Sequence, residues 1–409
     1  MPLVRRAALI ALALTLTSTS CLGGGGAGAP TILVDFSHDE FSSAFIKFFP
    51  GTVTARQGDE LVFRQTWTGE PHTVTGGTLA DELMEAVEPY IEKKNRGEPI
   101  PEEPPEDIAK LEEKVVWAFG EGDDLNQTGS QPCYLDRGEP RKDGKPCRTQ
   151  EQPSEFTGKQ SFYNSGIIPY EGPQGNEFRI QLANDIDPGA YWFYCIVHGE
   201  FQSTKVEVKP RDADVPAPGA VNRAARVEID RMADPLLELF RDAADGRVNL
   251  KDPRSDETYR MSGNFAGLYK PEAAFPEAQI NEFVPRRIRA RAGQKISWNM
   301  MGRHTISFGV PRYFPIIEFE DDGTVRFNRR LDPPAGGAKE FDVPEEERYG
   351  GGLEPIVFDG GTYDGTGFWS SGTMDADPFI EYSMRITKPG TYRYACLIHP
   401  PMVGTVEVT

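Results

Sequence analysis

Two stretches of the chain alternate aromatic side chains with other residues, as half-buried β-strands do. Residues 189–195 read Gly-Ala-Tyr-Trp-Phe-Tyr-Cys and residues 390–396 read Gly-Thr-Tyr-Arg-Tyr-Ala-Cys. Each follows a proline, so that a Pro-Gly turn opens the strand and a cysteine ends it. Each is followed by a short Val-Glu-Val run, at 206–208 and 406–408. With 42 Gly and 34 Pro to form turns, the pattern predicts an all-β chain of short strands.

Within the first half, residues 78–94 have the period of a helix and interrupt the pattern of strands. Apolar residues recur on one face of residues 78–94, at Leu79, Leu83, Val87 and Ile91. Thr78 and Asp81 are expected to form a capping box at the start of this helix, and residues 106–118 are expected to form a second helix. Both segments are acidic, which fits either a solvated surface or a face that docks on a partner.

The chain also contains an internal repeat. Three pairs of segments match in order: 49–63 with 284–298, 162–166 with 368–372, and 187–198 with 388–399. The repeat indicates two homologous β domains, at 31–209 with an insertion at about 78–160 and at 221–409. The Pro-rich polar stretch 210–220 reads as the linker between them. The second domain is expected to open with a helix at 221–242, interrupted at Pro235.

The N-terminus has the pattern of an export signal. A basic start with Arg5 and Arg6 precedes an apolar run that is too short to span a membrane. Cys21 closes this segment, and the Gly-rich stretch 22–30 follows. Residues 1–21 are therefore interpreted as a signal peptide of the lipoprotein type, with Cys21 acylated; the alternative is cleavage nearby and a free secreted protein.

The formal net charge of −19 at pH 7 disfavours nucleic acid as a partner, because phosphates attract Lys and Arg. It suits either docking on a basic partner or simple solubility.

The five Cys and five His are few enough to assign individually. Cys133 and Cys147 flank a polar loop without His, and in an exported protein they are expected to form a disulfide. Closing such a loop contributes roughly 3 kcal/mol in the chain-entropy model. His38 has no counterpart in the repeat and is expected to be a packing or surface residue.

The remaining Cys and His fall into two sets at matching positions of the repeat. The second domain offers His304, Cys396, His399 and Met402. Two imidazoles, one thiolate and a weak thioether form the donor set of a blue copper site, in which the thioether disfavours zinc. The first domain offers His72, Cys195 and His198. Aligned on the cysteines, Phe201 stands where Met402 does, and Gln202 lies beside it.

These motifs resemble the cupredoxin family of plastocyanin, amicyanin and azurin. The resemblance covers both domain cores, including the Pro-Gly-x-Tyr-x-aromatic-x-Cys-x-x-His segment, but not the leader or the insertions. It implies two tandem Greek-key β-sandwiches with one or two type 1 copper ions. Some family members use an axial Gln, so the first domain would hold copper with Gln202, or with three ligands if Phe201 fills the axial space, or would have lost copper.

The resemblance implies one-electron transfer outside the cytoplasm. The protein would then be lipid-anchored to the outer face of the cell membrane, or else periplasmic or secreted, and would exchange electrons with a partner such as a cytochrome or another copper protein. The alternative is storage or delivery of copper. A multicopper oxidase or nitrite reductase-like enzyme is disfavoured, because it needs further His ligands and four of the five His are already assigned. No catalytic residues are therefore predicted.

Overall fold

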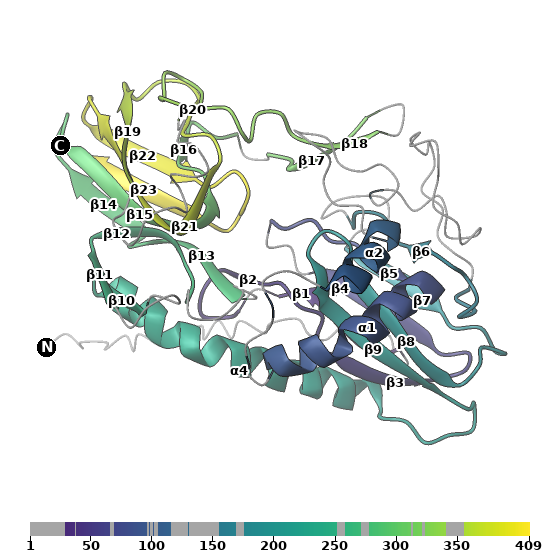
Figure 1. Cartoon of the computed structure of the whole chain (residues 1–409). Helices are drawn as coiled ribbons and strands as arrows, with labels where there is room; N and C mark the ends of the chain where they lie inside the picture. Colours follow the sequence, from purple (N-terminus) through teal and green to yellow (C-terminus); the bar gives the residue numbers. More distant parts are fainter. Residues whose placement is uncertain are drawn as a thin grey trace, which may run out of the picture.

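The computed structural model is dominated by β-strands, and the helices α1, α2 and α4 of its described part lie at the periphery (Figure 1). This confirms the predicted fold class, all-β with partly helical insertions. The residues that the structure describes are 29–36, 38–65, 69–95, 98, 101, 105–115, 130, 155–168, 176–251, 258–270, 278–311, 314–320, 324–340 and 356–409. None of the helices among them combines the length and apolar composition that a bilayer-spanning segment needs.

Two sheets face each other in the first half of the chain. The smaller sheet has the order β1-β4-β7, with β1 at Thr31–Asp35, β4 at Glu60–Gln65 and β7 at Glu177–Gln181. The larger has the order β3-β9-β8-β5-β6, with β3 at Thr52–Arg56, β9 at Gly199–Lys209, β8 at Gly189–Cys195, β5 at Thr75–Gly76 and β6 at Tyr163–Asn164. Buried side chains from both sheets, such as Phe63 and Phe193, form one shared core.

The second half repeats this arrangement with longer strands. One sheet has the order β19-β21-β15-β12-β13-β2, with β19 at Ile356–Tyr363, β21 at Met374–Ile386, β15 at Lys295–His304, β12 at Asn264–Leu268, β13 at Ala278–Val284 and β2 at Ser43–Phe45. The other has the order β14-β23-β22-β16-β20, with β14 at Arg287–Ala290, β23 at Val403–Val408, β22 at Gly390–Ala395, β16 at Ser307–Phe308 and β20 at Trp369–Ser370. Trp298 and Tyr394 meet in the core between these sheets.

The strand orders agree between the two halves. The order β3-β9-β8-β5-β6 corresponds strand by strand to β14-β23-β22-β16-β20, and β1-β4-β7 corresponds to β12-β15-β21. Two small hairpins lie outside these sheets: β10 at Arg247–Lys251 with β11 at Thr258–Ser262, and β17 at Ile317–Phe319 with β18 at Val325–Phe327.

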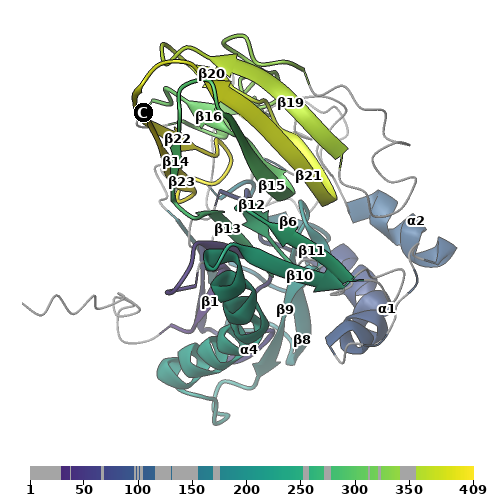
Figure 2. The same ribbon diagram turned by 90° about the vertical axis from the view of Figure 1, so that its left-hand side faces the viewer.

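Helices α1 (Thr78–Asn95) and α2 (Glu106–Val115) lie on the outer side of the first half (Figure 2). The apolar face of α1 buries Leu83 and Val87 against Trp192 of β8. The expected capping role of Asp81 is wrong. Its carboxylate instead accepts a hydrogen bond from the backbone N–H of Trp192 at 2.7 Å, because the packing of α1 on β8 brings that N–H within reach.

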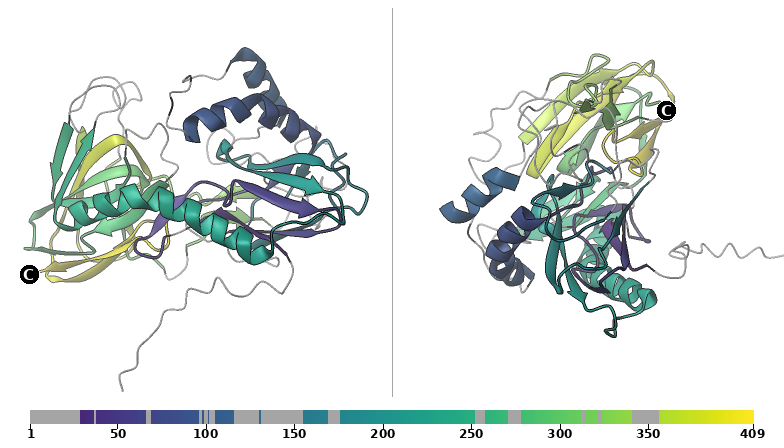
Figure 3. Two further views of the ribbon diagram at one scale, coloured as in Figure 1. Left: turned by 90° about the horizontal axis from the view of Figure 1, so that it is seen from below. Right: turned by 90° about the vertical axis from the view of Figure 1, so that its right-hand side faces the viewer.

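Helix α4 (Pro218–Ala244) runs lengthwise beneath both halves (Figure 3). The predicted interruption at Pro235 is wrong, since the helix continues through this residue. Its buried residues follow a spacing of three and four: Val221, Ala225, Ile229, Ala233, Leu236, Leu239 and Ala243. Burial of this stripe outweighs the loss of the one helical hydrogen bond that the exposed Pro235 cannot donate.

A seam of shared structure joins the two halves. The short strand β2, from the beginning of the chain, pairs antiparallel with β13 and so completes a sheet of the second half. Beside it, Phe41 and Phe45 of the first half share a buried core with Phe265 of the second half and Leu236 of α4. We call this cluster the seam core. The two repeats therefore do not pack as separate bodies.

Candidate metal centres

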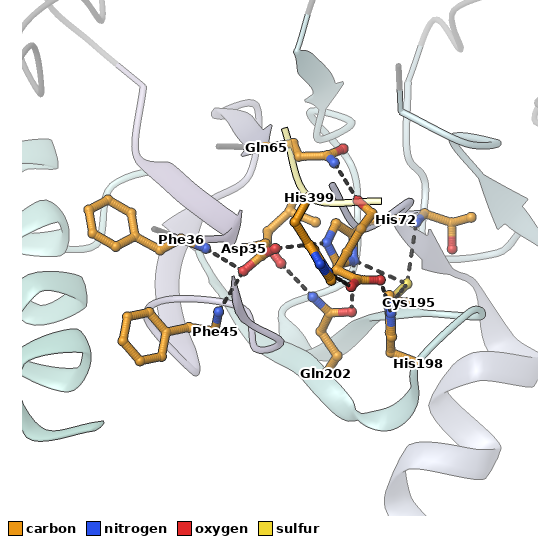
Figure 4. A network of polar contacts seen from close by, with 12 residues as sticks. Asp35, Phe36, Phe45, Gln65, His72, Cys195, His198, Gln202 and His399 are labelled. Atoms are coloured by element: carbon orange, nitrogen blue, oxygen red, sulfur yellow. Dashed lines mark hydrogen bonds and ion pairs between the residues drawn. The ribbon is translucent and has the colours of Figure 1, made fainter. Parts of the chain in front are cut away.

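The first ligand set forms a buried cluster at the end of the first sandwich (Figure 4). His72 follows β4 and forms an isolated bridge with Ile168, while Cys195 is the last residue of β8. The Sγ of Cys195 lies 3.5 Å from Nδ1 of His198 and 3.9 Å from Nδ1 of His72. The three donor atoms of this set lie within 4.8 Å of one another.

Gln202 adds a fourth polar group to this cluster. Its side chain is fully buried, and its Oε1 lies 3.1 Å from Nδ1 of His72. The Nε2 of Gln202 donates to the backbone oxygen of Val34 at 2.6 Å, which fixes which amide atom faces the cluster. Phe201, the residue before Gln202 in β9, is half-buried. The amide oxygen of Gln202 therefore faces the donor atoms.

The second ligand set has the same geometry. His304 is the last residue of β15, and Cys396 follows β22 directly. The Sγ of Cys396 lies 3.6 Å from Nδ1 of His399 and 3.9 Å from Nδ1 of His304, and the two Nδ1 atoms are 3.0 Å apart. Met402 is fully buried, and its backbone N–H and C=O close the loop onto His399 and Cys396.

The residue after the first histidine fixes each ligand loop. The backbone N–H of Thr73 points at Sγ of Cys195 from 3.4 Å, and Thr305 does the same for Cys396 at 3.4 Å. Their hydroxyl groups accept the N–H of the residue that follows each cysteine, at 3.0 Å for Ile196 and 2.8 Å for Leu397. The matching His-Thr pairs in the sequence thus hold each thiol in place.

The imidazoles stabilise the thiolate form of both cysteines. Burial alone would raise the pKa of the Cys195 thiol, but hydrogen bonds from His198 and His72 outweigh this and hold it well below its ordinary value. At Cys396, burial is likewise outweighed, first by the positive charge of His399 and then by hydrogen bonds from His304 and His399. A thiolate is the form that binds metals.

An outer carboxylate distinguishes the first cluster, and the sequence analysis missed it. Asp35 Oδ2 lies 3.2 Å from Nε2 of His72, and its other oxygen accepts the N–H groups of Phe36 and Phe45 (Figure 4). Burial lowers the pKa of His72, but the Asp35 hydrogen bond and the Cys195 thiolate reverse this and raise it. Asp35 lies at the end of a strand without a histidine or cysteine, so no motif marks it.

The corresponding histidine of the second cluster, His304, has no carboxylate at its Nε2 among the residues that the structure describes. Leu33 pairs with Arg64 and Phe265 with Asn299, and these pairs match in the repeat, so Gly267 occupies the position of Asp35. Gly267 has φ +72°, and a Cβ there would lie 2.0 Å from Nε2 of His304. That nitrogen is buried without a hydrogen-bond partner in the described part of the chain. Burial accordingly lowers the pKa of His304.

A second outer carboxylate, Glu70, was also missed, and it touches both clusters. Its Oε1 lies 2.8 Å from Nε2 of His399, and its Oε2 lies 3.7 Å from Nε2 of His198. Burial alone would lower the pKa of each of these histidines. The thiolate of its own cluster and Glu70 reverse this, raising the pKa of both His198 and His399 to about 10. Glu70 stands two residues before His72, a position that carries no recognised ligand pattern.

The donor chemistry fits copper at both clusters. Each cluster offers two imidazole Nδ1 atoms and one buried thiolate. A weaker donor follows the second histidine of each set in the sequence: the amide oxygen of Gln202 in the first and the thioether of Met402 in the second. In three of the four imidazoles, the opposite Nε2 faces a carboxylate, as is usual for histidines that bind metals.

Other predicted sites lie outside the clusters or outside the described residues. His38 stacks on Phe41 at a centroid distance of 4.9 Å and accepts the N–H of Glu40, and neither contact involves a ligand set. Cys21, Cys133 and Cys147 lie outside the described residues, so lipidation and the disulfide remain predictions. Among the described cysteines, Cys195 and Cys396 are unpaired.

No family model matches the chain, and no curated protein matches it. Solved structures that match include a mutant of amicyanin with Cu(I), at 16% identity over 30% of this chain and 70% of that chain, with a TM-score of 0.15. Amicyanin from Paracoccus versutus matches at 16% identity over 31% of this chain and 73% of that chain, also with a TM-score of 0.15. Similarity at this TM-score does not establish a shared family.

Proposed function

We propose that the protein carries single electrons with two type 1 copper centres, one in each half. The observation that carries this proposal is the repeated cluster of two imidazole Nδ1 atoms and one thiolate, each within 4.8 Å. Copper bound there would supply the Cu(I)/Cu(II) couple. His72, Cys195, His198 and Gln202 would hold one ion, and His304, Cys396, His399 and Met402 the other.

The surroundings of the donors support a carrier rather than an enzyme. His72, Cys195, His304, His399 and Met402 are all fully buried, and Cys396 is nearly so. The side chain of His198 is 16% exposed, so an electron can enter the first centre through this imidazole while the thiolate stays enclosed. The strands and the Thr73 and Thr305 hydrogen bonds hold the donors in one arrangement, which limits reorganisation when the charge changes.

The test is to load the purified protein with copper and record its visible spectrum and its redox cycling. We expect a strong thiolate-to-copper band and two reversible one-electron steps. Cys195→Ser should remove one contribution and Cys396→Ser the other, with copper stoichiometry falling from two to one. Colourless protein that takes only Cu(I) would contradict electron transfer and favour storage or delivery of copper.

Export, a lipid anchor at Cys21 and a redox partner protein are further proposals that rest on the sequence alone. A cytochrome or another copper protein would be a suitable partner. Labelling cells with a fatty acid should tag the wild type but not Cys21→Ala, and the variant should leave the membrane fraction. Equal labelling of both proteins would contradict the anchor.

A further inference from the structure

Glu70 lies between the two candidate centres and contacts one imidazole of each. Its two carboxylate oxygens face different halves of the chain: Oε1 is 2.8 Å from Nε2 of His399, and Oε2 is 3.7 Å from Nε2 of His198. Figure 4 shows His399 of the second half entering the polar network around His72 and His198 of the first. One side chain therefore joins two ligand sets that are about 200 residues apart in the sequence.

The backbone around Glu70 is built to make this contact. Gly69 has φ +113°, and a Cβ there would lie 2.1 Å from the backbone oxygen of Ile398 and 2.9 Å from Cα of His399. Glycine therefore lets this segment press directly on the second ligand loop. On the other side, Nε2 of Gln65 donates to the backbone oxygen of Glu70 at 2.8 Å. This hydrogen bond fixes the backbone of Glu70 on the side opposite the second ligand loop, while the carboxylate faces both histidines.

A second contact brings the same two regions together. Ile167 of the first half and Val325 of β18 form a small buried cluster, and Val197, between Cys195 and His198, packs against this cluster. The first ligand loop is therefore covered by the β17–β18 hairpin of the other repeat.

The orientation of the imidazoles suits a shared acceptor. In both His198 and His399, Nδ1 faces the thiolate of its own cluster, at 3.5 Å and 3.6 Å. With Nδ1 used for a metal, Nε2 carries the proton and can donate it to a carboxylate. The position of Glu70 in the repeat is taken by Gly302 in the second half, so the second half supplies no carboxylate from that position.

We propose that Glu70 is a shared positioning residue, whose carboxylate orients His198 and His399 together and supplies negative charge to both centres. The proposal rests on the proposed function in that both clusters must take a metal, but it does not depend on which metal. Its distinctive consequence is that one substitution in the first half alters the centre in the second half. A residue that serves only its own half cannot do this.

The primary test measures Co(II) affinity at each centre separately, in Cys396→Ser for the first centre and in Cys195→Ser for the second. Adding Glu70→Gln should weaken binding at both centres, by about 10-fold to 100-fold, because outer carboxylates of metal-bound His contribute that much. Glu60→Gln, which removes the same charge from an exposed ion pair with Arg179, is the matched control and should change neither. A change at one centre only, or at neither, would overturn the proposal.

The copper protein gives an independent readout. Loss of the shared negative charge disfavours Cu(II) at both sites, so Glu70→Gln should raise both reduction potentials. Each tenfold change in the affinity for Cu(I) relative to Cu(II) corresponds to about 59 mV. Glu70→Asp keeps the charge but is one methylene shorter, so its carboxylate can reach one histidine and not both. Compared with Glu70→Gln, it should bring the reduction potential of one centre part of the way back to the wild-type value. If Glu70→Gln does not fold, the reduction potentials of Glu70→Asp test the proposal instead. Potentials in Glu70→Asp that equal those of the wild type at both centres would contradict it.

These arms separate the two proposals. A colourless copper protein whose Co(II) affinities nonetheless fall together in Glu70→Gln would contradict electron transfer and support the shared carboxylate. Normal blue copper spectra with unshifted affinities and potentials in Glu70→Gln would support electron transfer and overturn the shared carboxylate.

Discussion

Asp35 and Gly267 occupy one position of the repeat and give the two candidate centres different surroundings. The carboxylate of Asp35 strengthens His72 as a donor, while Nε2 of His304 faces the backbone around Gly267. A more basic, negatively supported ligand set favours Cu(II) and so lowers the reduction potential. The first centre is therefore expected to have the lower potential, which would direct electrons from the first half to the second.

Asp35→Asn tests this asymmetry. The amide can still accept the N–H groups of Phe36 and Phe45, so the fold should be retained while the charge beside His72 is lost. We expect the potential of the first centre to rise by about 60–120 mV, the equivalent of a 10-fold to 100-fold change in relative affinity, with the second unchanged. Spectroelectrochemistry of the variant and of Asp39→Asn, a surface control paired with Arg226, would measure it. Equal potentials in the wild type and Asp35→Asn would contradict the argument.

The axial position provides a second prediction at this scale. Gln202→Met replaces a hard amide oxygen by a soft thioether, which favours Cu(I), so the potential of the first centre should rise. Met402→Gln should lower the potential of the second centre for the same reason. Phe201→Leu tests the alternative axial residue, because it changes the neighbouring side chain and leaves Gln202 in place. A potential that responds to Phe201→Leu and not to Gln202→Met would show that the axial assignment is wrong.

The His and Cys ligands of both sets could be predicted from the sequence, because these residues are scarce and recur at matching spacings. Sequence reasoning left Gln202 and Phe201 open, because the start of β9 pairs irregularly with β8, with Tyr194 opposite Ser203 but Cys195 opposite Gly199, and no sequence pattern marks this irregularity. It did not find Asp35 or Glu70. Carboxylates are common in an acidic chain, and only the folded arrangement shows which of them face a ligand histidine.

At the scale of single elements, α1 carries a buried charge at its start. Burial raises the pKa of Asp81 to about 7, and the nearby Glu85 acts in the same direction, against the hydrogen bond from Trp192. An acid whose pKa is higher in the folded state than in the unfolded state stabilises the fold fully below its unfolded pKa, near 4. This stability is lost as the pH rises from about 4 to about 7.

Asp81→Asn should remove this pH dependence. The amide oxygen can still accept the Trp192 N–H, so the variant is expected to be more stable than the wild type at pH 8, by about 1–3 kcal/mol, and to differ little at pH 4. Urea unfolding at both pH values, followed by the fluorescence of the tryptophans, would measure the difference. A gain of the same size at pH 4 would point to a cause other than the carboxyl group.

Helix α4 shows how packing overrides a local signal. Pro235 predicts a break, because it lacks an N–H to donate within the helix, yet seven buried residues on one stripe keep the helix continuous. The side chain of Pro235 itself is exposed. The strands were easier to predict than this helix, because their alternation and turns agree with the final packing.

Pro235→Ala should therefore stabilise the protein. Alanine restores one helical hydrogen bond and removes the steric conflict of the ring, and no packing is lost at this exposed position. The expected gain is about 1–2 kcal/mol, less than the roughly 3 kcal/mol cost of an interior proline because alanine leaves the unfolded chain more flexible. The urea midpoint would record it. A lower midpoint would mean that the ring supports the path of α4 through contacts.

At the scale of the whole molecule, the seam core makes the two halves depend on each other. The pairing of β2 with β13 and the burial of Phe41, Phe45 and Phe265 with α4 cross from one repeat to the other. A protease site inserted in the exposed segment 210–217 should therefore give two fragments that elute together on size exclusion. They should separate only in denaturant. Separation under native conditions would contradict this role of the seam core.

Strand β2 also has a consequence for the time course of synthesis. Its partner β13 begins about 230 residues later in the chain. At about 5–20 residues per second, the ribosome needs roughly 12–50 s to cover that distance. For most of this interval, until α4 is complete at Ala244, Phe41 and Phe45 have neither β13 nor α4 to cover them. The nascent first repeat therefore exposes an aggregation-prone apolar edge until the second repeat is synthesised. A chaperone that shields this edge would protect the nascent chain from aggregation.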